Sequence, residues 1–170
     1  MTDLNTKELL TKLSKDLKRH CQEQCIEDAV FIGIQTGGVW VAKQLQQLLN
    51  NESKLGVLDI TFYRDDFSRV GIQPTVKPSK LPLSVDDEHI ILVDDVLHTG
   101  RTIRAALNEI FDYGRPASVS LVALVQRNGR ELPIQADVVA HTLDLDASQH
   151  VKLRGPEPLQ LEIIEQKIKS

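Results

Sequence analysis

Several features that would assign this sequence to a special class of protein are scarce in it. Aromatic residues make up 4% of the sequence, cysteine occurs only twice, and the formal net charge is −4. Proteins that bind nucleic acids without sequence preference rely on a large excess of Lys and Arg, because their affinity comes from neutralising phosphates. This chain lacks that excess, so any contact with RNA would need a local basic patch.

Long hydrophobic runs are also missing. The longest runs have about six residues, whereas a membrane-spanning helix needs about 20. No basic segment followed by an apolar stretch opens the sequence, as it would in a secretory signal peptide. We therefore expect a protein of the cytoplasm with no membrane partner.

The two cysteines do not indicate a metal site. Cys21 and Cys25 stand four residues apart in a segment with helical periodicity, and His20 alone beside them gives too few ligands. We predict two reduced thiols, as is usual in the cytoplasm.

What remains is the composition of an ordinary globular domain. The 170 residues are 41% hydrophobic and 26% charged, which suits one hydrophobic core. No internal repeat, low-complexity tract or linker divides the chain. We therefore predict a single domain over residues 1–170.

The hydrophobic pattern predicts strands that alternate with helices. Apolar runs typical of strands buried on both faces span residues 29–34, 55–63, 90–93 and 119–125. Apolar residues at helical spacing follow a capping box at Asn5 and recur over residues 39–49 and 102–113, where Gly114 would end the helix. Residues 136–142 and 159–164 look like shorter strands of a C-terminal appendage. This order predicts an α/β fold with a mostly parallel central sheet flanked by helices.

Residues 64–87 interrupt this pattern. They include three prolines, Pro74, Pro78 and Pro82. They contain few apolar residues and show no hydrophobic periodicity. An irregular stretch of this length in a compact domain is usually a functional lid or a disordered loop.

The strongest functional signal is the run IILVDDVLHTGRT at residues 90–102. Ligands of open α/β sheets bind where strands end and helices begin. The turn from Thr99 to Thr102 can offer successive backbone N–H groups and two hydroxyls to a phosphate, aided by the helix dipole. Asp94 and Asp95 would repel a phosphate, but they suit sugar hydroxyls or a magnesium ion held by pyrophosphate. The run therefore predicts a ribose 5-phosphate site, against the alternative of an acidic pair that merely caps a helix.

This run resembles the motif with which type I phosphoribosyltransferases bind 5-phosphoribosyl-1-pyrophosphate (PRPP). With Arg64-Asp65-Asp66 before it and GRELPI at residues 129–134 after it, the sequence resembles the PyrR family over roughly residues 33–139. That family regulates pyrimidine operons by binding mRNA and has uracil phosphoribosyltransferase activity. The resemblance implies a type I phosphoribosyltransferase fold with a flexible hood, and the conversion of uracil and PRPP to UMP and pyrophosphate.

The resemblance also implies site residues. Asp94 and Asp95 would hold the ribose hydroxyls, and Arg64 of the hood would act with them as a catalytic residue. The residues implied to bind substrate lie in the pyrophosphate loop, the PRPP motif and the base pocket: Thr36, Gly37, Gly38, Val96, Leu97, His98, Thr99, Gly100, Arg101, Thr102, Arg130, Leu132, Pro133 and Ile134. No residue is implied to bind a metal directly. Mg²⁺ would arrive with PRPP and meet Asp94 and Asp95 only indirectly.

The reaction sets demands on such a site. Breaking the bond from ribose C1 to pyrophosphate builds positive charge on the sugar and negative charge on the leaving group. The site must therefore clamp pyrophosphate and exclude water, and it needs no covalent nucleophile. The backbone N–H groups of the Gln35–Gly38 turn and the hood arginine Arg64 are suited to that task.

Three positions differ from the patterns of related families. His98 stands where the 6-oxopurine transferases have an aspartate that serves the purine, which argues against hypoxanthine or guanine; it could contact ribose, pack or transfer a proton. The Gln35–Gly38 turn is uncharged, whereas the family often has basic residues there. Gln135 and His141 stand where RNA-binding PyrR proteins tend to have Arg or Lys.

Several functions stay open at this point. The first is uracil phosphoribosyltransferase activity, with PRPP, uracil and UMP as ligands, the mRNA leader of pyrimidine genes as a further partner, and a homodimer or homotetramer as the assembly. A second is an RNA-binding attenuator that senses UMP or PRPP with little turnover. A third is transfer to another base, such as adenine, orotate or xanthine.

Overall fold

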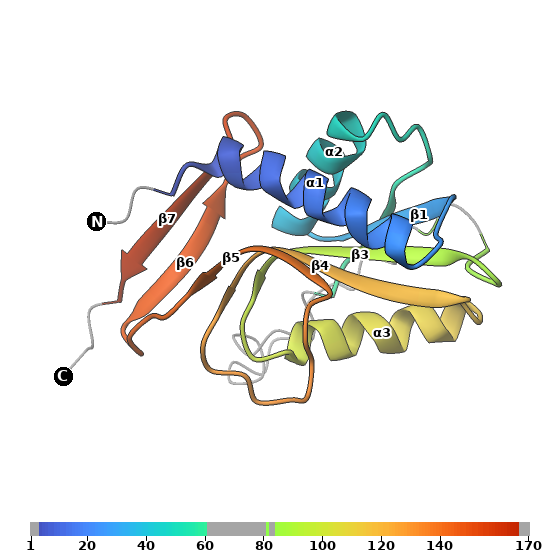
Figure 1. Ribbon diagram of the computed structural model, residues 1–170. Coiled ribbons are helices and arrows are strands. Elements are labelled where there is room, and N and C mark those ends of the chain that lie inside the picture. Colours follow the sequence, from blue (N-terminus) through green and yellow to red (C-terminus); the bar gives the residue numbers. More distant parts are fainter. Residues whose placement is uncertain (1–3, 61–80, 82–83, 167–170) are drawn as a thin grey trace.

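A five-stranded parallel sheet forms the centre of the computed structural model, which describes residues 4–60, 81 and 84–166. The strand order is β2-β1-β3-β4-β5. The strands are β1 (Ala29–Ile34), β2 (Gly56–Leu58), β3 (His89–Leu97), β4 (Ser118–Arg127) and β5 (Val138–Leu143). Helices α1 (Thr6–Glu23) and α2 (Gly37–Leu48) cover one face of the sheet, and α3 (Arg101–Tyr113) covers the other (Figure 1). The predicted α/β fold with a parallel central sheet is confirmed.

Strand β3 contributes to a hydrophobic core on each face of the sheet. Ile91 and Val93 belong to the core beneath α1 and α2, whereas Ile90 and Leu92 belong to the core beneath α3. Successive side chains of a strand point to opposite faces, so a strand covered on both faces must be apolar throughout. This is why the run at residues 90–93 is continuous rather than alternating.

Helix α1 begins at the predicted capping box. The Glu8 backbone N–H donates to Asn5 Oδ1 at 3.2 Å, and Asn5 Nδ2 donates to Glu8 Oε1 at 2.8 Å. At its other end the Ile26 N–H donates to the Cys21 carbonyl at 2.8 Å, while Cys25 has a φ of 55°. This is the Schellman arrangement, in which glycine usually takes the left-handed position.

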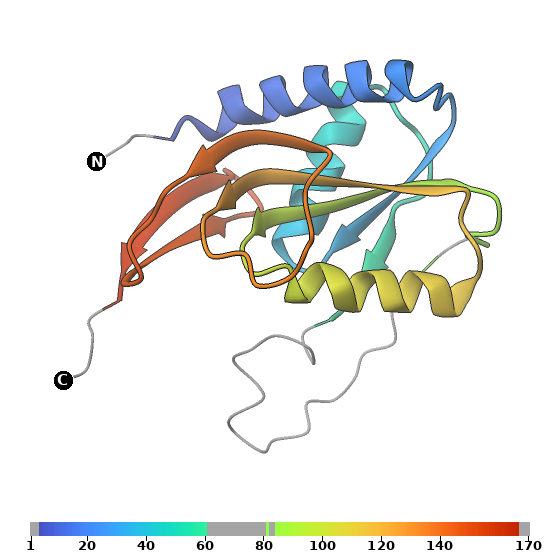
Figure 2. The same ribbon diagram turned by 60° about the horizontal axis from the view of Figure 1, so that its bottom comes forward.

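The last two strands form an antiparallel hairpin of β6 (Gln149–Arg154) and β7 (Gln160–Glu165), which lies beyond one end of the central sheet (Figure 2). Arg127 Nη1 donates to the Gln149 carbonyl at 2.6 Å, and the Asn128 side chain exchanges two 3.0 Å hydrogen bonds with the backbone of Leu145. These bonds tie the hairpin to the carboxyl end of β4.

Several boundaries differ from prediction. The strand predicted over residues 55–63 is β2, which ends at Leu58, because residues 59 and 60 belong to no strand. Residues 136–142 were expected in a C-terminal appendage, but β5 is the fifth strand of the central sheet because it pairs with β4. The apolar run predicted a strand that ends at residue 93, before Asp94 and Asp95, but β3 continues to Leu97, with Asp94 opposite Ala123 and Val96 opposite Val125. No helix in the described part of the chain is long and apolar enough to span a membrane.

Candidate active site

The order of the strands places a binding site between β1 and β3. From β1 the chain moves to one side of the sheet to form β2, and it then returns to the other side of β1 to form β3. In open parallel sheets the crevice at such a switch point, at the carboxyl ends of the strands, is where ligands bind. Here the Gln35–Gly38 turn follows β1, and Asp94 and Asp95 lie in the last part of β3.

Two glycines allow α2 to begin close to β3. A Cβ atom at Gly38 would lie 2.5 Å from the Val93 carbonyl oxygen and 3.1 Å from Asp94 Cα. A Cβ atom at Gly37 would lie 2.5 Å from Asp95 Cγ. At Gly38 the obstacle is backbone, so only glycine permits this approach, and at Gly37 the start of α2 lies against the Asp95 carboxylate.

The two aspartates differ in exposure. Asp94 is buried, and its Oδ1 accepts a hydrogen bond from the Asp95 N–H at 2.9 Å. Asp95 is half-buried, and its Oδ1 accepts from the Val96 N–H at 3.0 Å. Bonds to neighbouring backbone N–H groups fix the directions of both carboxylates before any ligand arrives.

The turn after β3 leaves backbone N–H groups and a hydroxyl that could bind an anion. Gly100 precedes α3 with a φ of 92°, a left-handed conformation that glycine adopts without strain. The Arg101 N–H donates to Thr99 Oγ1 at 3.2 Å, so the Thr99 hydroxyl keeps its own hydrogen for another acceptor. Neither α2 nor α3 has a side-chain cap or an acidic residue in its first turn. Their N-terminal N–H groups can therefore serve anions.

The segment after β4 contacts this turn. The N–H groups of Glu131 and Leu132 donate to the Thr99 carbonyl at 3.0 and 3.2 Å, and Arg101 Nε pairs with Glu131 Oε2 at 2.7 Å. Ile134 lies over Gly100, where a Cβ atom would come within 3.1 Å of it. The predicted base-pocket residues and phosphate turn are thus brought together.

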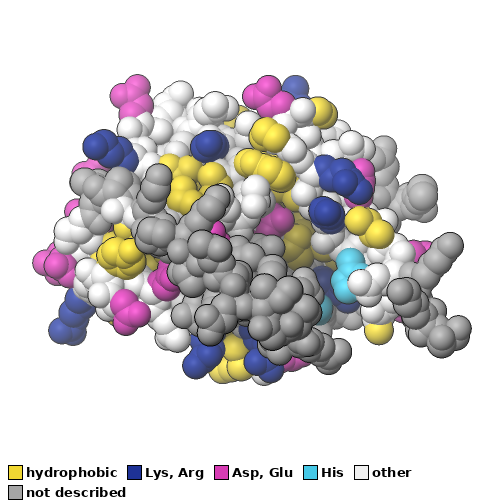
Figure 3. Space-filling model, turned by 180° about the vertical axis from the view of Figure 1, so that it is seen from behind, with side chains coloured by type: hydrophobic (Ala, Val, Ile, Leu, Met, Phe, Trp, Pro, Cys, Tyr) yellow, Lys and Arg dark blue, Asp and Glu magenta, His cyan; other side chains and the backbone are white. Residues whose placement is uncertain are grey.

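His98 lies among positive charges. Burial lowers the pKa of His98 below its ordinary value, and the Arg127 guanidinium lowers it further. His150 and Arg130 act in the same direction, and Glu131 acts against them. Histidine and basic side chains lie next to one another toward the hairpin side of the molecule (Figure 3). A His98 held neutral keeps one ring nitrogen as a hydrogen-bond acceptor.

The structure gathers most of the predicted site residues at one edge of the sheet. Thr36 to Gly38 and Val96 to Thr102 surround the two aspartates, and Arg130 to Ile134 adjoin the phosphate turn. Arg64, Asp65, Asp66 and the predicted hood up to residue 80 lie outside the described residues. Arg127 is not among the predicted site residues, although it is buried and reaches the hairpin; its only signal in the sequence is an arginine at the end of an apolar strand.

The chain offers no metal cage in the described ranges. Within residues 4–60, 81 and 84–166, no three His, Cys, Asp or Glu side chains come together in a way that could hold an ion. Among these described residues, Asp94 and Asp95 are the acidic side chains in the last part of β3.

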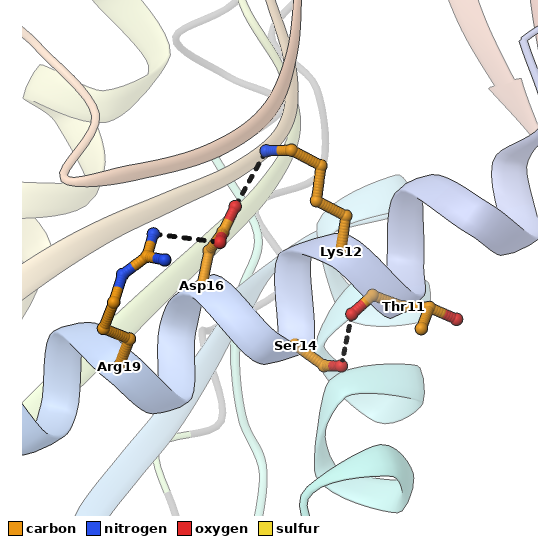
Figure 4. Close-up of polar contacts among 5 residues, drawn as sticks. All are labelled: Thr11, Lys12, Ser14, Asp16 and Arg19. Carbon is orange, nitrogen blue, oxygen red and sulfur yellow. Dashed lines mark hydrogen bonds and ion pairs between the residues drawn. The ribbon is translucent and has the colours of Figure 1, made fainter.

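The basic face of α1 is partly neutralised on the helix itself. Lys12 Nζ and Arg19 Nη2 approach the Asp16 carboxylate to 2.8 and 3.0 Å (Figure 4). The hydrogen bond from Lys12 is the largest influence that lowers the pKa of Asp16, and burial opposes it. Of the basic residues Lys12, Lys15, Lys18 and Arg19 of this helix, Lys12 and Arg19 thus have an acidic partner on the helix itself.

Comparison with known proteins agrees with this geometry. The family model described as phosphoribosyl transferase domain matches residues 4–153. A protein of Nitrosococcus oceani named bifunctional protein PyrR is 61% identical over 162 residues, which cover 94% of this chain and 92% of that protein. A protein of the same name from Pseudomonas paraeruginosa is 58% identical, with 93% of each chain covered.

Solved structures share the fold. The hypoxanthine phosphoribosyltransferase of Trypanosoma cruzi superposes with a TM-score of 0.70 at 16% identity, with 98% of each chain covered. A hypoxanthine phosphoribosyltransferase of Staphylococcus aureus gives a TM-score of 0.67 at 19% identity, with 85% of this chain and 78% of that chain covered. At such identities the likeness concerns the fold alone.

Proposed function

This chain belongs to the PyrR family of phosphoribosyltransferases, and on that premise we propose that it transfers phosphoribose from PRPP to uracil. The products are UMP and pyrophosphate. Membership rests on the 61% identical relative and on the family model that matches residues 4–153. The choice of uracil rests on the PyrR resemblance and on His98, which replaces the aspartate of the 6-oxopurine transferases.

One observation carries the proposal. Two helix N-termini that lack acidic residues and side-chain caps flank a pair of oriented carboxylates at the switch point of the sheet. PRPP has the matching order of groups, with pyrophosphate on C1, hydroxyls on C2 and C3, and phosphate on C5. Pyrophosphate would lie at the start of α2, the hydroxyls at Asp94 and Asp95, and the 5′-phosphate at the start of α3.

This arrangement suits the chemistry of the transfer. As the C1–pyrophosphate bond breaks, the ribose ring gains positive charge, and the carboxylates that hold its hydroxyls stabilise that charge. The N–H groups at the start of α2 stabilise the charge on the leaving pyrophosphate. Uracil N1 bonds to C1 as the bond to pyrophosphate breaks, and its proton passes to the leaving pyrophosphate or to solvent. Because the base takes the place of pyrophosphate directly, no covalent intermediate with the protein is needed.

Mg²⁺ would enter with PRPP. Asp94 and Asp95 are the acidic groups near the ribose position, and their carboxylates are ligands that magnesium accepts. When bound to the diphosphate, the ion would neutralise part of its charge. The protein residues would meanwhile hold the sugar between the two phosphate positions.

Turnover with a panel of bases tests the proposal. Purified protein is mixed with PRPP, Mg²⁺ and one of uracil, adenine, orotate, xanthine or hypoxanthine, and pyrophosphate release is measured. We expect release with uracil and its loss in Asp95→Asn. A higher kcat/KM with another base would overturn the assignment of uracil, and no release with any base would overturn the transferase function.

Regulation of pyrimidine genes through their mRNA leader is the second function that we propose. It rests on membership of a family whose relatives are named bifunctional. Filter binding to that leader RNA at fixed salt tests it, because phosphate contacts make the affinity fall as salt rises. Binding no tighter than to an unrelated RNA of equal length would refute it.

We propose a homodimer or homotetramer as the assembly.

A further inference from the structure

The segment that follows β4 supports the phosphate turn from behind. Arg130 Nη1 donates a hydrogen bond to the His98 carbonyl. The N–H groups of Glu131 and Leu132 donate to the Thr99 carbonyl at 3.0 and 3.2 Å. Three hydrogen bonds from three consecutive residues therefore hold the carbonyl oxygens of His98 and Thr99, which lie at the start of the turn.

Peptide geometry passes this constraint to the ligand side. The His98–Thr99 and Thr99–Gly100 peptide bonds are trans. In a trans peptide the carbonyl oxygen and the following N–H lie in one plane and point in opposite directions. Holding the carbonyls of His98 and Thr99 therefore also fixes the N–H groups of Thr99 and Gly100, which point to the other side of the turn.

We propose that Arg130 is a positioning residue, which orients the first N–H groups of the phosphate turn instead of binding the base. This inference rests on the proposed function, because it takes the 5′-phosphate of PRPP as the ligand of the turn. A guanidinium bond to a carbonyl is charge-assisted and is stronger than the two backbone bonds beside it. Arg130 thus makes the strongest single bond of the three.

The surroundings hold Arg130 in the required place. Its Nη2 donates to Gln126 Oε1 at 3.3 Å, and Gln126 Nε2 donates to the Thr142 hydroxyl at 3.0 Å. The guanidinium thus bridges β4 and the loop after β3, and β4 is linked in turn to β5. Gly129, with a φ of 102°, lets the segment come close, because a Cβ atom there would lie 2.9 Å from His98 Nε2. The backbone at Gly129 and the side chain of Gln126 thus hold the Arg130 guanidinium against the His98 carbonyl.

The test measures binding to the turn without any base. Calorimetry gives the affinities of Arg130→Ala and Arg130→Lys for PRPP with Mg²⁺ and for ribose 5-phosphate. We expect Arg130→Ala to weaken both ligands by the same factor, about tenfold or more, because both present the same 5′-phosphate to a loosened turn. Arg130→Lys should fall in between, because it keeps the charge but cannot bridge His98 and Gln126.

Chemical rescue separates positioning from a general loss of structure. Methylguanidinium in the buffer should restore part of the affinity of Arg130→Ala by occupying the space that the side chain leaves. The matched control is Arg115→Ala, an exposed arginine at the opposite end of β4, which should bind as the wild type does with or without the additive. Gln126→Ala should weaken binding by a smaller factor and add nothing in the Arg130→Ala background.

The opposite pattern would overturn the inference. Wild-type affinity of Arg130→Ala for PRPP and ribose 5-phosphate, with a raised KM for uracil, would make Arg130 a ligand of the base. A tenfold loss that methylguanidinium does not reduce, with Arg130→Lys as weak as Arg130→Ala, would also contradict positioning. The affinities for PRPP and ribose 5-phosphate are measured without turnover, so failure of the uracil assignment would show separately, as PRPP binding without uracil-dependent pyrophosphate release.

Discussion

Replacing Gly37 with alanine should damage catalysis more than it damages folding. A Cβ atom at this position would lie 2.5 Å from Cγ and 2.9 Å from Cβ of Asp95, whereas carbon atoms in contact prefer about 3.5–4.0 Å. The Asp95 carboxylate must therefore rotate away from the start of α2, and because rotation does not move Asp95 Cβ, the backbone must also shift slightly. Gly37→Ala thus displaces a predicted ribose ligand without changing its chemistry.

The contacts of Gly37 give the expected changes in stability and in kcat/KM. Forcing an extra methyl group into a close-packed site costs about 1–3 kcal/mol of stability, and replacing glycine by alanine in a helix returns up to about 1 kcal/mol. The net loss in the free energy of unfolding should be about 0–3 kcal/mol. A misdirected Asp95 loses a charge-assisted hydrogen bond to the substrate of about 1.5–3 kcal/mol. This corresponds to a fall in kcat/KM of about 10- to 100-fold.

A double-mutant cycle makes this reasoning testable. Uracil-dependent pyrophosphate release and thermal melting are measured for Gly37→Ala, Asp95→Ala and the double mutant. Because Asp95→Ala removes the carboxylate, Gly37→Ala should cost little further activity in that background. Gly38→Ala is the control for folding: its methyl group would meet the Val93 carbonyl at 2.5 Å, and this backbone group cannot rotate away. Additive losses of activity in the cycle would refute a link between Gly37 and Asp95.

Three further predictions concern the turn, the histidine and the end of α1. Replacing both Thr99 and Thr102 by alanine should weaken PRPP binding by about 2 kcal/mol, because two hydrogen bonds to a charged group are lost; wild-type affinity by calorimetry would contradict this. Because burial lowers the pKa of His98, the unfolded chain binds that proton more readily, and the folded state loses stability as the pH falls below about 6.5. Urea unfolding at about pH 7.5 and 5.5 should show a smaller loss in His98→Gln, and an equal loss would refute the assignment. Cys25→Gly should raise the free energy of unfolding by about 0.5–1 kcal/mol, because a φ of 55° strains cysteine more than glycine; unchanged urea midpoints would show that the left-handed position costs nothing.

Local sequence patterns were sufficient to predict much of the fold. The apolar run at residues 29–34 coincides with β1, because a strand buried on both faces must be apolar from end to end. Helix α3 begins one residue before the predicted start and ends at the predicted Tyr113, where Gly114 follows. In these elements the hydrophobic periodicity and the residues that end the element predict the same boundaries.

Pairing between distant residues explains what the patterns missed. Strand β3 extends through Asp94 and Asp95, because β4 offers hydrogen-bond partners along that length. Polarity alone suggested a loop there. Strand β6 escaped prediction because only Leu153 among its residues is buried, and its stability comes from pairing with β7 and from the bond of Arg127 to Gln149. Such contacts leave no periodic signal.

Local patterns and distant contacts also contribute differently to the site. The sequence predicts which chemical groups are present, and tertiary contacts set the directions in which those groups point. The aspartates, the threonines and the glycine of the PRPP motif lie within nine residues of one another, so a local pattern can reveal them. The bonds that orient their backbone come from Arg130 to Leu132, about thirty residues later in the chain, and nothing in the motif specifies them. A phosphate turn whose N–H groups point the wrong way would keep the motif and lose the affinity. Variation at residues 129–132 should therefore alter PRPP binding in chains whose PRPP motif is unchanged.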